Sequence, residues 1–235
     1  MNLDSAEILT HLASTYQHKV GEAQSLVVNL ALASGEEEPE VYHVVVAPGR
    51  EVAVHEGRAA DARFTIKTSP DMLRRIYERE LTALTAAGRA RMSDPAPLDV
   101  ELAPDVGFTP ELQAELYAFL QHFFTPTWPE VIPLGEAHAR VVHGAHAIPL
   151  FYHPGARSAW YQVNPGEQVN EPGDTNPFPQ AFIFIKGEGR ATIGDTTLDV
   201  QAGQAVYVPP GADHVIRNES DAPLEVIFLA WGPGA

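Results

Sequence analysis

Residues 203–218 read GQAVYVPPGADHVIRN, and this stretch decides the fold of the C-terminal half. A short strand-like run ends in Pro-Pro-Gly, which predicts a tight turn, and a histidine follows on the next run. The spacing is G-x5-P-x-G-x2-H-x3-N, from Gly203 through Pro209 and Gly211 to His214 and Asn218. Imidazole is a common metal ligand, so the question is which other residues could share an ion with His214.

The residues around this stretch form a series of short strand-like runs separated by turn signals. The runs span 139–145, 147–153, 158–163, 180–187, 189–194, 196–200, 204–210, 213–218 and 224–231. Many short strands at close spacing predict an all-β sandwich or barrel. We therefore expect residues 136–235 to form one all-β domain.

With the motif at 203–218, this half resembles the cupin family, a double-stranded β-helix barrel, over about residues 136–233. The family's first motif is G-x5-H-x-H-x3,4-E-x6-G, and Gly187 matches its closing glycine. Counting back from Gly187, Gln180 stands at the glutamate position, and Asp174 and Asn176 stand at the two histidine positions. The resemblance implies a pocket in which these three side chains face His214.

The metal chemistry of this pocket differs from that of the family. A cupin metal site offers three imidazoles and a carboxylate to Fe, Mn, Ni or Zn. Here the same positions offer the imidazole of His214, the carboxylate of Asp174 and the amides of Asn176 and Gln180, and amides bind transition metals poorly. We therefore expect no resident cofactor, with a divalent transition metal on His214 and Asp174 as the alternative. A hydrogen bond from His214 to Gln180 or Asp174 is the structural alternative to metal binding.

The strand that begins at Gln180 predicts the character of the interior. Residues two apart in a strand share a face, so Gln180, Phe182 and Phe184 point the same way. If Gln180 faces inward, the interior is an apolar pocket with a small polar end, which suits a hydrophobic ligand with a carboxyl or hydroxyl head. A packed core is the alternative.

The N-terminal half has a mixed pattern. An amphipathic helix covers residues 8–16, strand-like runs cover 25–33, 41–47, 51–57 and 62–68, and helices begin at Ser69-Pro70 and Thr109-Pro110. Residues 89–93 are a candidate for a further short strand. This pattern predicts an α+β domain, a small antiparallel sheet with helices packed on it.

The stretches YHVVVAPGREVAVHEGRAADARFTIKTSPDMLRRI and ALTAAGRARMSD resemble the sterol carrier protein 2 family, over roughly residues 5–124. The resemblance implies a sheet and helices that enclose an apolar tunnel for sterols or acyl chains. The candidate lining residues are Phe64, Ile66, Met72, Ile76, Phe119 and Phe123. A packed core predicts the same residues, so the sequence leaves both alternatives open.

Three prolines, Pro126, Pro129 and Pro133, fall close together between the two halves. Proline removes a backbone donor and disfavours helix in the residue before it, so we expect an extended linker over residues 125–135. The predicted organisation is a sterol-carrier-like α+β domain over 1–124, this linker, and a cupin barrel over 136–235. The two halves are expected to fold separately.

Composition excludes some classes of partner. The formal net charge is −16 and is spread along the chain, so nucleic-acid phosphates and anionic membrane surfaces would be repelled. No apolar run approaches the roughly 20 residues that a spanning helix needs, and the N-terminus lacks the pattern of a signal peptide. The sequence has no cysteine, so a cytoplasmic protein without disulfides is expected.

These observations predict a protein that binds or senses a hydrophobic small molecule, such as a lipid, a sterol or an acyl-type ligand, without chemistry of its own. The alternative is a metal-dependent cupin enzyme, an oxygenase or isomerase acting on a lipid-like substrate. A structural or regulatory module with both pockets filled by side chains is a third hypothesis. A homodimer is also expected, with Ile183, Ile185, Val226 and Phe228 on the outer face of the barrel and buried by the partner.

Overall fold

The structure is a computed structural model that describes residues 3–35, 38–91 and 93–235. The chain divides into two compact units. The first comprises Met1–Ala87 and Pro95–Pro133, and the second comprises Gly88–Asp94 and Leu134–Ala235. The sequence predicts two domains, 1–124 and 136–235, joined by a linker at 125–135. That these two halves fold independently stays a prediction.

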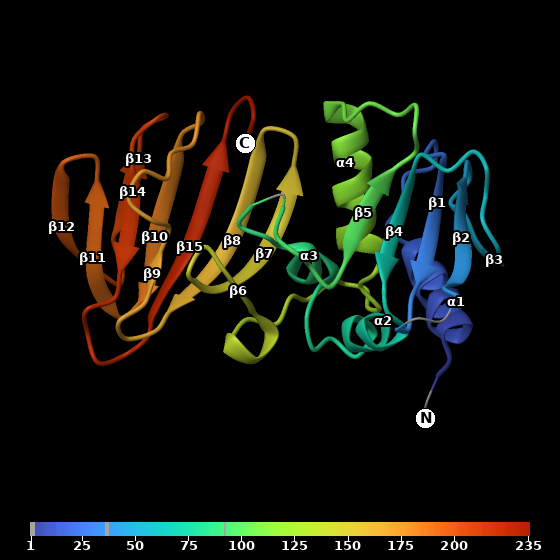
Figure 1. The fold of residues 1–235 in the computed structure, drawn as a ribbon, viewed down its shortest axis with the longest axis horizontal. Helices are drawn as coiled ribbons and strands as arrows, with labels where there is room; N and C mark the ends of the chain where they lie inside the picture. The colour runs from blue at the N-terminus through green and yellow to red at the C-terminus, as the bar shows by residue number, and fades with distance from the viewer. Residues whose placement is uncertain (1–2, 36–37, 92) are drawn as a thin grey trace. The chain divides into compact units, whose positions relative to one another are not determined.

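The first unit is an α+β structure built on one sheet. Figure 1 shows β5, β4, β1, β2 and β3 in this order across the unit. Its elements are α1 (Ser5–Tyr16), β1 (Leu26–Leu32), β2 (Glu40–Ala47), β3 (Glu51–Glu56), β4 (Phe64–Thr68), α2 (Pro70–Tyr77), α3 (Ala83–Ala87), β5 (Asp99–Leu102), α4 (Pro110–Ala118) and the π-helical turn η1 (Phe119–Phe123).

This sheet departs from the sequence prediction in two respects. The pair β1–β4 is parallel, while the other pairs are antiparallel. The fifth strand forms at Asp99–Leu102, after the candidate stretch 89–93, of which Met92 lies outside the described residues. The helix α3 was not predicted, because five residues are too few to show a helical period.

The helices of this unit begin where the sequence places capping residues. The side chains of Ser69 and Thr109 accept hydrogen bonds from the backbone N–H groups of Met72 and Leu112, and a proline follows each cap. At the first helix, Asp4 and Glu7 form a capping box. Each cap satisfies a backbone donor that the helix itself leaves unpaired.

One face of this sheet forms the core of the first unit. Val28, Phe64 and Ile66 are buried on that face. The ring of Phe119 packs against both Phe64 and Tyr16 of α1, at centroid distances of 6.3 Å and 5.8 Å. The sheet, α1 and η1 therefore meet at Phe119 in close aromatic contacts.

The proline-rich segment after η1 is anchored in the first unit by a buried lysine. The side chain of Lys19 is 2% exposed, and its Nζ lies 3.0 Å from Glu130 Oε1. The same Nζ donates to the carbonyl oxygens of His122 at 2.9 Å and Thr125 at 2.6 Å, so all three ammonium donors have partners. His122 Nδ1 also lies 2.9 Å from Glu130 Oε2. Thr125 and Glu130 of the predicted linker are therefore packed against Lys19 of the first unit.

We predict that Glu130→Gln lowers the free energy of unfolding at neutral pH by about 1–3 kcal/mol, because a buried ammonium group loses its counter-charge. Burial alone would raise the pKa of Glu130, but hydrogen bonds from His122 and Lys19 outweigh it and hold this pKa below the usual value of a glutamate. A carboxyl whose pKa is lower in the folded state stabilises the fold above its unfolded pKa. The difference between wild type and variant should therefore shrink as the pH falls through the folded pKa. A difference that stays constant from pH 7 to pH 3 in chemical denaturation would contradict this account.

The second unit is all-β apart from one short turn of helix. Its elements are η2 (Glu136–His138), β6 (Arg140–Val142), β7 (Ala145–His153), β8 (Ala156–Val163), β9 (Gln168–Val169), β10 (Gln180–Lys186), β11 (Glu188–Ile193), β12 (Thr196–Gln201), β13 (Ala205–Val208), β14 (His214–Arg217) and β15 (Leu224–Trp231). The sequence predicted these strands except β9, which has only two residues.

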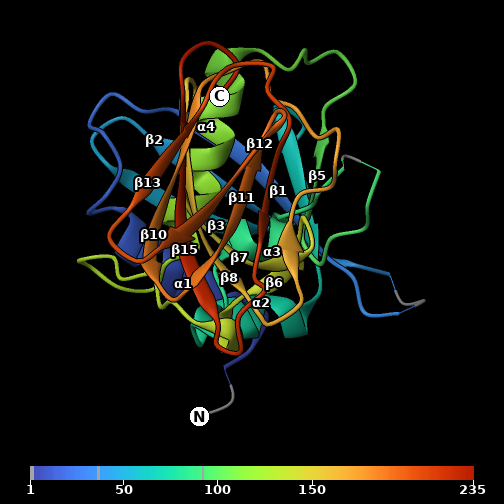
Figure 2. The same cartoon turned by 90° about the vertical axis from the view of Figure 1, so that its left-hand side faces the viewer.

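These strands form two sheets, a six-stranded one in the order β13-β10-β15-β8-β7-β6 and a four-stranded one in the order β12-β11-β14-β9. In Figure 2, β13, β10 and β15 lie to one side and β11 and β12 to the other. One buried apolar cluster takes residues from both sheets, for example Phe184 from the first and Ile216 from the second. The interior between the sheets is therefore the core of this unit.

The direction of the side chains on β15 corrects part of the sequence analysis. Val226 and Phe228 belong to the interior cluster, so they do not form an outer face with Ile183 and Ile185. Ile185 is exposed, and Ile183 is partly exposed. The pairing of two copies stays a prediction, and the outward residues of β15 available for it are Ile227 and Leu229.

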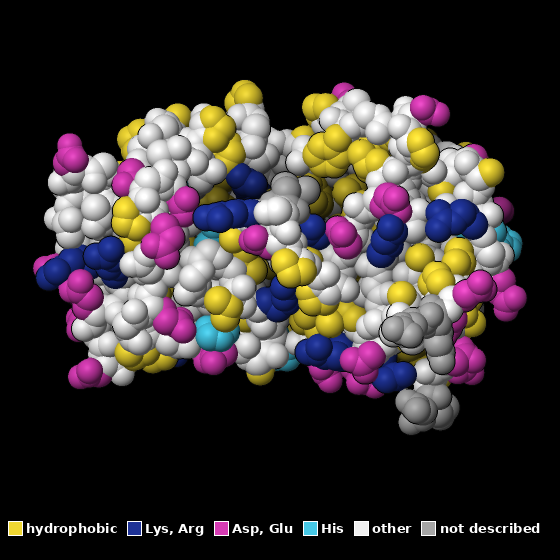
Figure 3. Space-filling view, in the orientation of Figure 1, with side chains coloured by type: hydrophobic (Ala, Val, Ile, Leu, Met, Phe, Trp, Pro, Cys, Tyr) yellow, Lys and Arg dark blue, Asp and Glu magenta, His cyan; other side chains and the backbone are white. Residues whose placement is uncertain are grey.

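Among the described residues, no helix is both long and apolar enough to cross a membrane. Acidic and basic side chains are scattered over the face seen in Figure 3, as the spread of charge along the sequence predicts.

Candidate functional site

His214 is positioned by the turn that precedes β14. Gly211 has φ +78°, a left-handed conformation that glycine adopts without strain. Its N–H donates to the carbonyl oxygen of Asn176 at 2.7 Å, which fastens the loop before β10 to this turn. Asn218, the last residue of the motif, is 1% exposed, and its side-chain amide donates to the carbonyl oxygens of Val163 and Ala222. The motif therefore holds the histidine in place from both sides.

A chain of hydrogen bonds joins Asn176, Gln180 and His214. Asn176 Nδ2 donates to Gln180 Oε1 at 3.2 Å, and Gln180 Nε2 lies 3.2 Å from His214 Nε2. At the other side of the ring, His214 Nδ1 lies 3.1 Å from the carbonyl oxygen of Ala212. Gln180 is 0% and His214 is 1% exposed, so water does not compete for these bonds.

The partners fix the tautomer of His214. A carbonyl oxygen only accepts, so Nδ1 carries the proton and donates to Ala212. Since Gln180 Oε1 is the acceptor for Asn176, the Gln180 amide group directs its N–H toward His214. Nε2 of His214 is then the acceptor of that bond, and its lone pair is not free for another ligand.

Asp174 lies apart from this chain. Its side chain is exposed, and Oδ2 accepts the backbone N–H of Glu171 at 2.9 Å within the local turn. Of the two residues at the family's histidine positions, only Asn176 reaches Gln180. The sequence reasoning missed this because it placed residues by motif spacing, while the turn at 171–174 directs the aspartate outward.

The donor set of the pocket does not suit a transition metal. Its nitrogen and oxygen atoms belong to one imidazole already bonded through Nε2 and to two neutral amides. Among residues 3–35, 38–91 and 93–235, no group of three or more histidine, cysteine, aspartate or glutamate side chains is placed to hold a metal ion. We therefore derive no chemical step through a metal.

The lining of the interior is apolar beyond this polar end. Phe182 and Phe184 are each 1% exposed and point inward with Gln180, as the strand alternation predicts. Phe182 lies 5.8 Å from the His214 ring and 5.6 Å from the Phe228 ring. The interior residues that keep some exposure are Val142, Ile193, Val206, Ala212 and Phe228. Ile193, which pairs with the buried His214, is one of these partly exposed residues.

The structure brings a cation to the same end, which the sequence analysis missed. Arg157 lies opposite Ala230 and Tyr152 in the register of the six-stranded sheet, and Ala230 lies opposite Gln180. The guanidinium carbon of Arg157 lies 4.5 Å from the centre of the Phe178 ring and 5.9 Å from that of Tyr152. Arg157 shares a face with Tyr161 by strand alternation, but the predicted strand 158–163 began one residue too late to include it.

The pKa of His143 responds to burial and to the charged groups around it. Burial lowers the pKa of His143. The charges of Arg157 and His214 lower it further, while the carboxylate of Asp174 raises it.

His143 and Gly144 form the two-residue turn between β6 and β7, with φ +55° and +85°. A Cβ at Gly144 would lie 2.5 Å from the carbonyl oxygen of Gln168, so this close approach requires glycine. Burial also raises the pKa of Tyr161, which Arg157 partly offsets.

The six residues predicted to line a tunnel in the N-terminal half are all buried. Their exposed fractions are 1% for Phe64, 0% for Ile66, 8% for Met72, 2% for Ile76 and 0% for Phe119 and Phe123. The rings of Phe119 and Phe123 are stacked at 4.5 Å, and each also contacts Tyr16. This packing favours the core alternative over an open tunnel.

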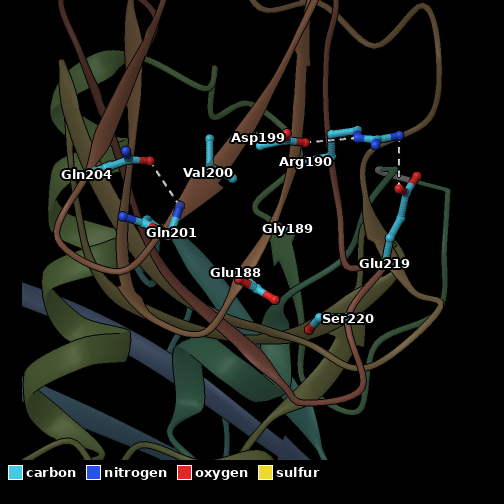
Figure 4. Close-up of a pocket in the computed structure, with 9 residues that line it drawn as sticks. All are labelled: Glu188, Gly189, Arg190, Asp199, Val200, Gln201, Gln204, Glu219 and Ser220. Atoms are coloured by element: carbon cyan, nitrogen blue, oxygen red, sulfur yellow. Dashed lines mark hydrogen bonds and ion pairs between the residues drawn. The ribbon is translucent and has the colours of Figure 1, made fainter.

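A solvent-filled groove of about 460 Å³ lies at the far end of β11 and β12 from His214. In Figure 4, Arg190 bridges Asp199 at 3.2 Å and Glu219 at 3.0 Å. Glu188, Gln201 and Gln204 complete its polar lining. The carboxylates there are largely neutralised or solvated, so the groove offers no catalytic arrangement.

The model of the cupin domain matches residues 159–230, which include Gln180 and the motif around His214. The C-terminal part of this chain contains a cupin domain. The matched region lies within the second unit, and these comparisons give no support for a sterol carrier domain in the N-terminal half.

Three similar proteins share low sequence identity with this chain. The chain is 26% identical over 54 residues to uncharacterized protein MJ1618 of Methanocaldococcus jannaschii, a match over 23% of this chain and 43% of that protein's length. A Cupin 2 conserved barrel domain protein from Salinispora arenicola is 23% identical, with a TM-score of 0.40 over 45% of this chain and 91% of that one. The plu4264 protein from Photorhabdus luminescens is 16% identical, with a TM-score of 0.40 over 43% of this chain and 87% of that one.

We predict that Gln180→Met destabilises the cupin domain by about 1–3 kcal/mol, because it leaves the Nε2 acceptor of His214 buried and unpaired. The double variant Gln180→Met with His214→Phe removes both partners. It should cost clearly less than the sum of the two single changes in chemical denaturation. Additive costs would show that the two side chains do not interact.

Proposed function

We propose that the cupin domain binds a small amphiphilic molecule inside the barrel and performs no metal-dependent chemistry. The observation that carries this proposal is the hydrogen bond between Gln180 Nε2 and His214 Nε2. It occupies the histidine nitrogen that would otherwise face the interior as a ligand. The pocket is then a binding surface with polar atoms at one end.

The lining indicates the chemical class of the ligand. Phe182, Phe184 and Phe228 supply apolar surface, and the amide, imidazole and Tyr161 hydroxyl groups lie among them. Pockets for small molecules commonly combine an apolar body with a few polar groups that fix orientation. An acyl-type or similar molecule with a polar head fits this combination.

The competing function is a metal-dependent oxygenase or isomerase acting on a lipid-like substrate. It would need His214 Nε2 released from Gln180, and further anionic or imidazole donors beside it. Asp174 is the nearest carboxylate in the sequence motif, yet it caps an exposed turn. The donor set therefore favours binding over catalysis.

The role of the N-terminal unit as a sterol or acyl carrier rests on the sequence resemblance. Its candidate lining residues are packed against one another, so a ligand there would have to displace the ring of Phe119 or Phe123. Such displacement is costly in a close-packed core. The barrel differs because Phe228 and Ile193, which pack against its interior cluster, keep some exposure, and we therefore assign the ligand to the barrel.

Decanol binding measured by isothermal titration calorimetry tests the proposal. Ala159 faces the interior opposite Phe228, so Ala159→Phe should fill the pocket and reduce binding at least about tenfold. The matched control is Ala181→Phe. Ala181 precedes the inward-facing Phe182 on β10 and therefore points to the outer face of the six-stranded sheet, so this change adds the same volume outside the interior and should leave binding unchanged.

Thermal unfolding of both variants establishes that each is folded. No binding of decanol to the wild-type protein, or equal binding by the wild type and Ala159→Phe, would contradict the proposal.

A further inference from the structure

Arg157 is a partly buried cation of the cupin domain that forms no ion pair with any described residue. Its Nε atom is shut off from solvent and has no hydrogen-bond partner. Within the part of the chain that the structure describes, its guanidinium group makes neither a hydrogen bond nor an ion pair with a carboxylate. This contrasts with a net charge of −16, which supplies abundant acidic partners. A guanidinium left unpaired while partly buried carries a free-energy cost that an anionic ligand would relieve.

The register of the sheet places Arg157 beside the polar end of the pocket. Gln180, Ala230, Arg157 and Tyr152 occupy one row across four neighbouring strands, on the interior face. Adjacent strands are 4.7–4.9 Å apart, so the backbones at Gln180 and Arg157 are about 10 Å apart. The residue between them is alanine, whose side chain is small. A ligand head could therefore be reached by Arg157 on one side and by the Gln180–His214 pair on the other.

The contacts of Arg157 leave its donors available. Its guanidinium group lies over the ring of Phe178, which packs with Ala230 and Phe228. Stacking occupies the face of a guanidinium group, while its N–H donors lie in the plane. Two of these donors match the two oxygens of a carboxylate. Stacking therefore orients the group and keeps its carboxylate-binding edge unpaired.

The charges around the site select the kind of anion. The groups that act on His143 in this region are Arg157, His214, Asp174 and Asp94, of which only Arg157 is a permanent cation. With the carboxylates of Asp174 and Asp94 also acting on this region, the single arginine can pair with a singly charged head and leaves no positive charge for a second one. A doubly charged phosphate would need a further cation.

We propose that Arg157 binds the carboxylate group of an amphiphilic acid whose apolar part lies along Phe228 and Phe182. This inference rests on the proposed function, because it names the head group of the ligand assigned to the barrel. It makes Arg157 the residue that distinguishes an acid from the corresponding alcohol.

Calorimetry with decanoate and decanol, at pH 7.5 and below their aggregation concentrations, tests the inference. Arg157→Gln should weaken decanoate binding by about tenfold or more, the effect of one charge-assisted contact, and change decanol binding less than about twofold. Arg157→Lys keeps the charge and loses the planar pairing, so it should fall between wild type and Arg157→Gln for decanoate. The matched control is Arg217→Gln, an exposed arginine bonded to Gln168, which removes the same charge and should affect neither ligand.

The outcomes separate this inference from the proposed function. Binding of both ligands to wild type, with Arg157→Gln changing both equally or neither, would overturn the role of Arg157 and leave the binding function intact. Failure of wild type to bind either ligand would overturn the binding function and the inference with it. Should Arg157→Gln fail to fold in thermal unfolding, the ratio of decanoate to decanol affinity in Arg157→Lys decides, and an unchanged ratio would overturn the inference.

Discussion

The hydrogen bond between Gln180 and His214 is the constraint on which the site depends. It links β10 of the six-stranded sheet to β14 of the four-stranded sheet, across the interior. Both side chains are buried, so each needs a hydrogen-bond partner, and they bond to one another. Asn176 and Ala212 occupy the remaining polar atoms of the pair, which makes the arrangement self-sufficient. A metal would have to break this chain before binding.

The same constraint gives the pocket its character. With the polar atoms of Gln180 and His214 satisfied by one another, the surface they present beside Phe182 suits a ligand that needs few hydrogen bonds. The unpaired polar capacity lies two strands further, at Arg157. The pocket thus combines the neutral Gln180–His214 pair, whose polar atoms are bonded, with the cation Arg157, whose donors are unpaired. This combination suits the recognition of an anionic head group.

The sequence could predict the barrel because its strands are short, its turns are marked by glycine and proline, and the spacing around His214 is specific. It also predicted that Gln180, Phe182 and Phe184 share one face, since alternation within one strand is a local property. It failed at Val226 and Phe228, because the phase of β15 relative to β10 is set by pairing between distant strands. It failed at Asp174 because a local turn directs that side chain outward. Arg157 escaped notice because its position depends on the register of three strands, which no local pattern encodes.

The state of His214 Nε2 tests the central claim most directly. Long-range proton–nitrogen correlation spectra of ¹⁵N-histidine-labelled protein at neutral pH distinguish a protonated from an unprotonated ring nitrogen. The account predicts a His214 ring with its proton on Nδ1, and an Nε2 signal that does not move on addition of one equivalent of Zn²⁺, because Gln180 holds that nitrogen. A proton on Nε2, or a stoichiometric shift of its signal with Zn²⁺, would contradict the account and favour a metal-dependent cupin enzyme.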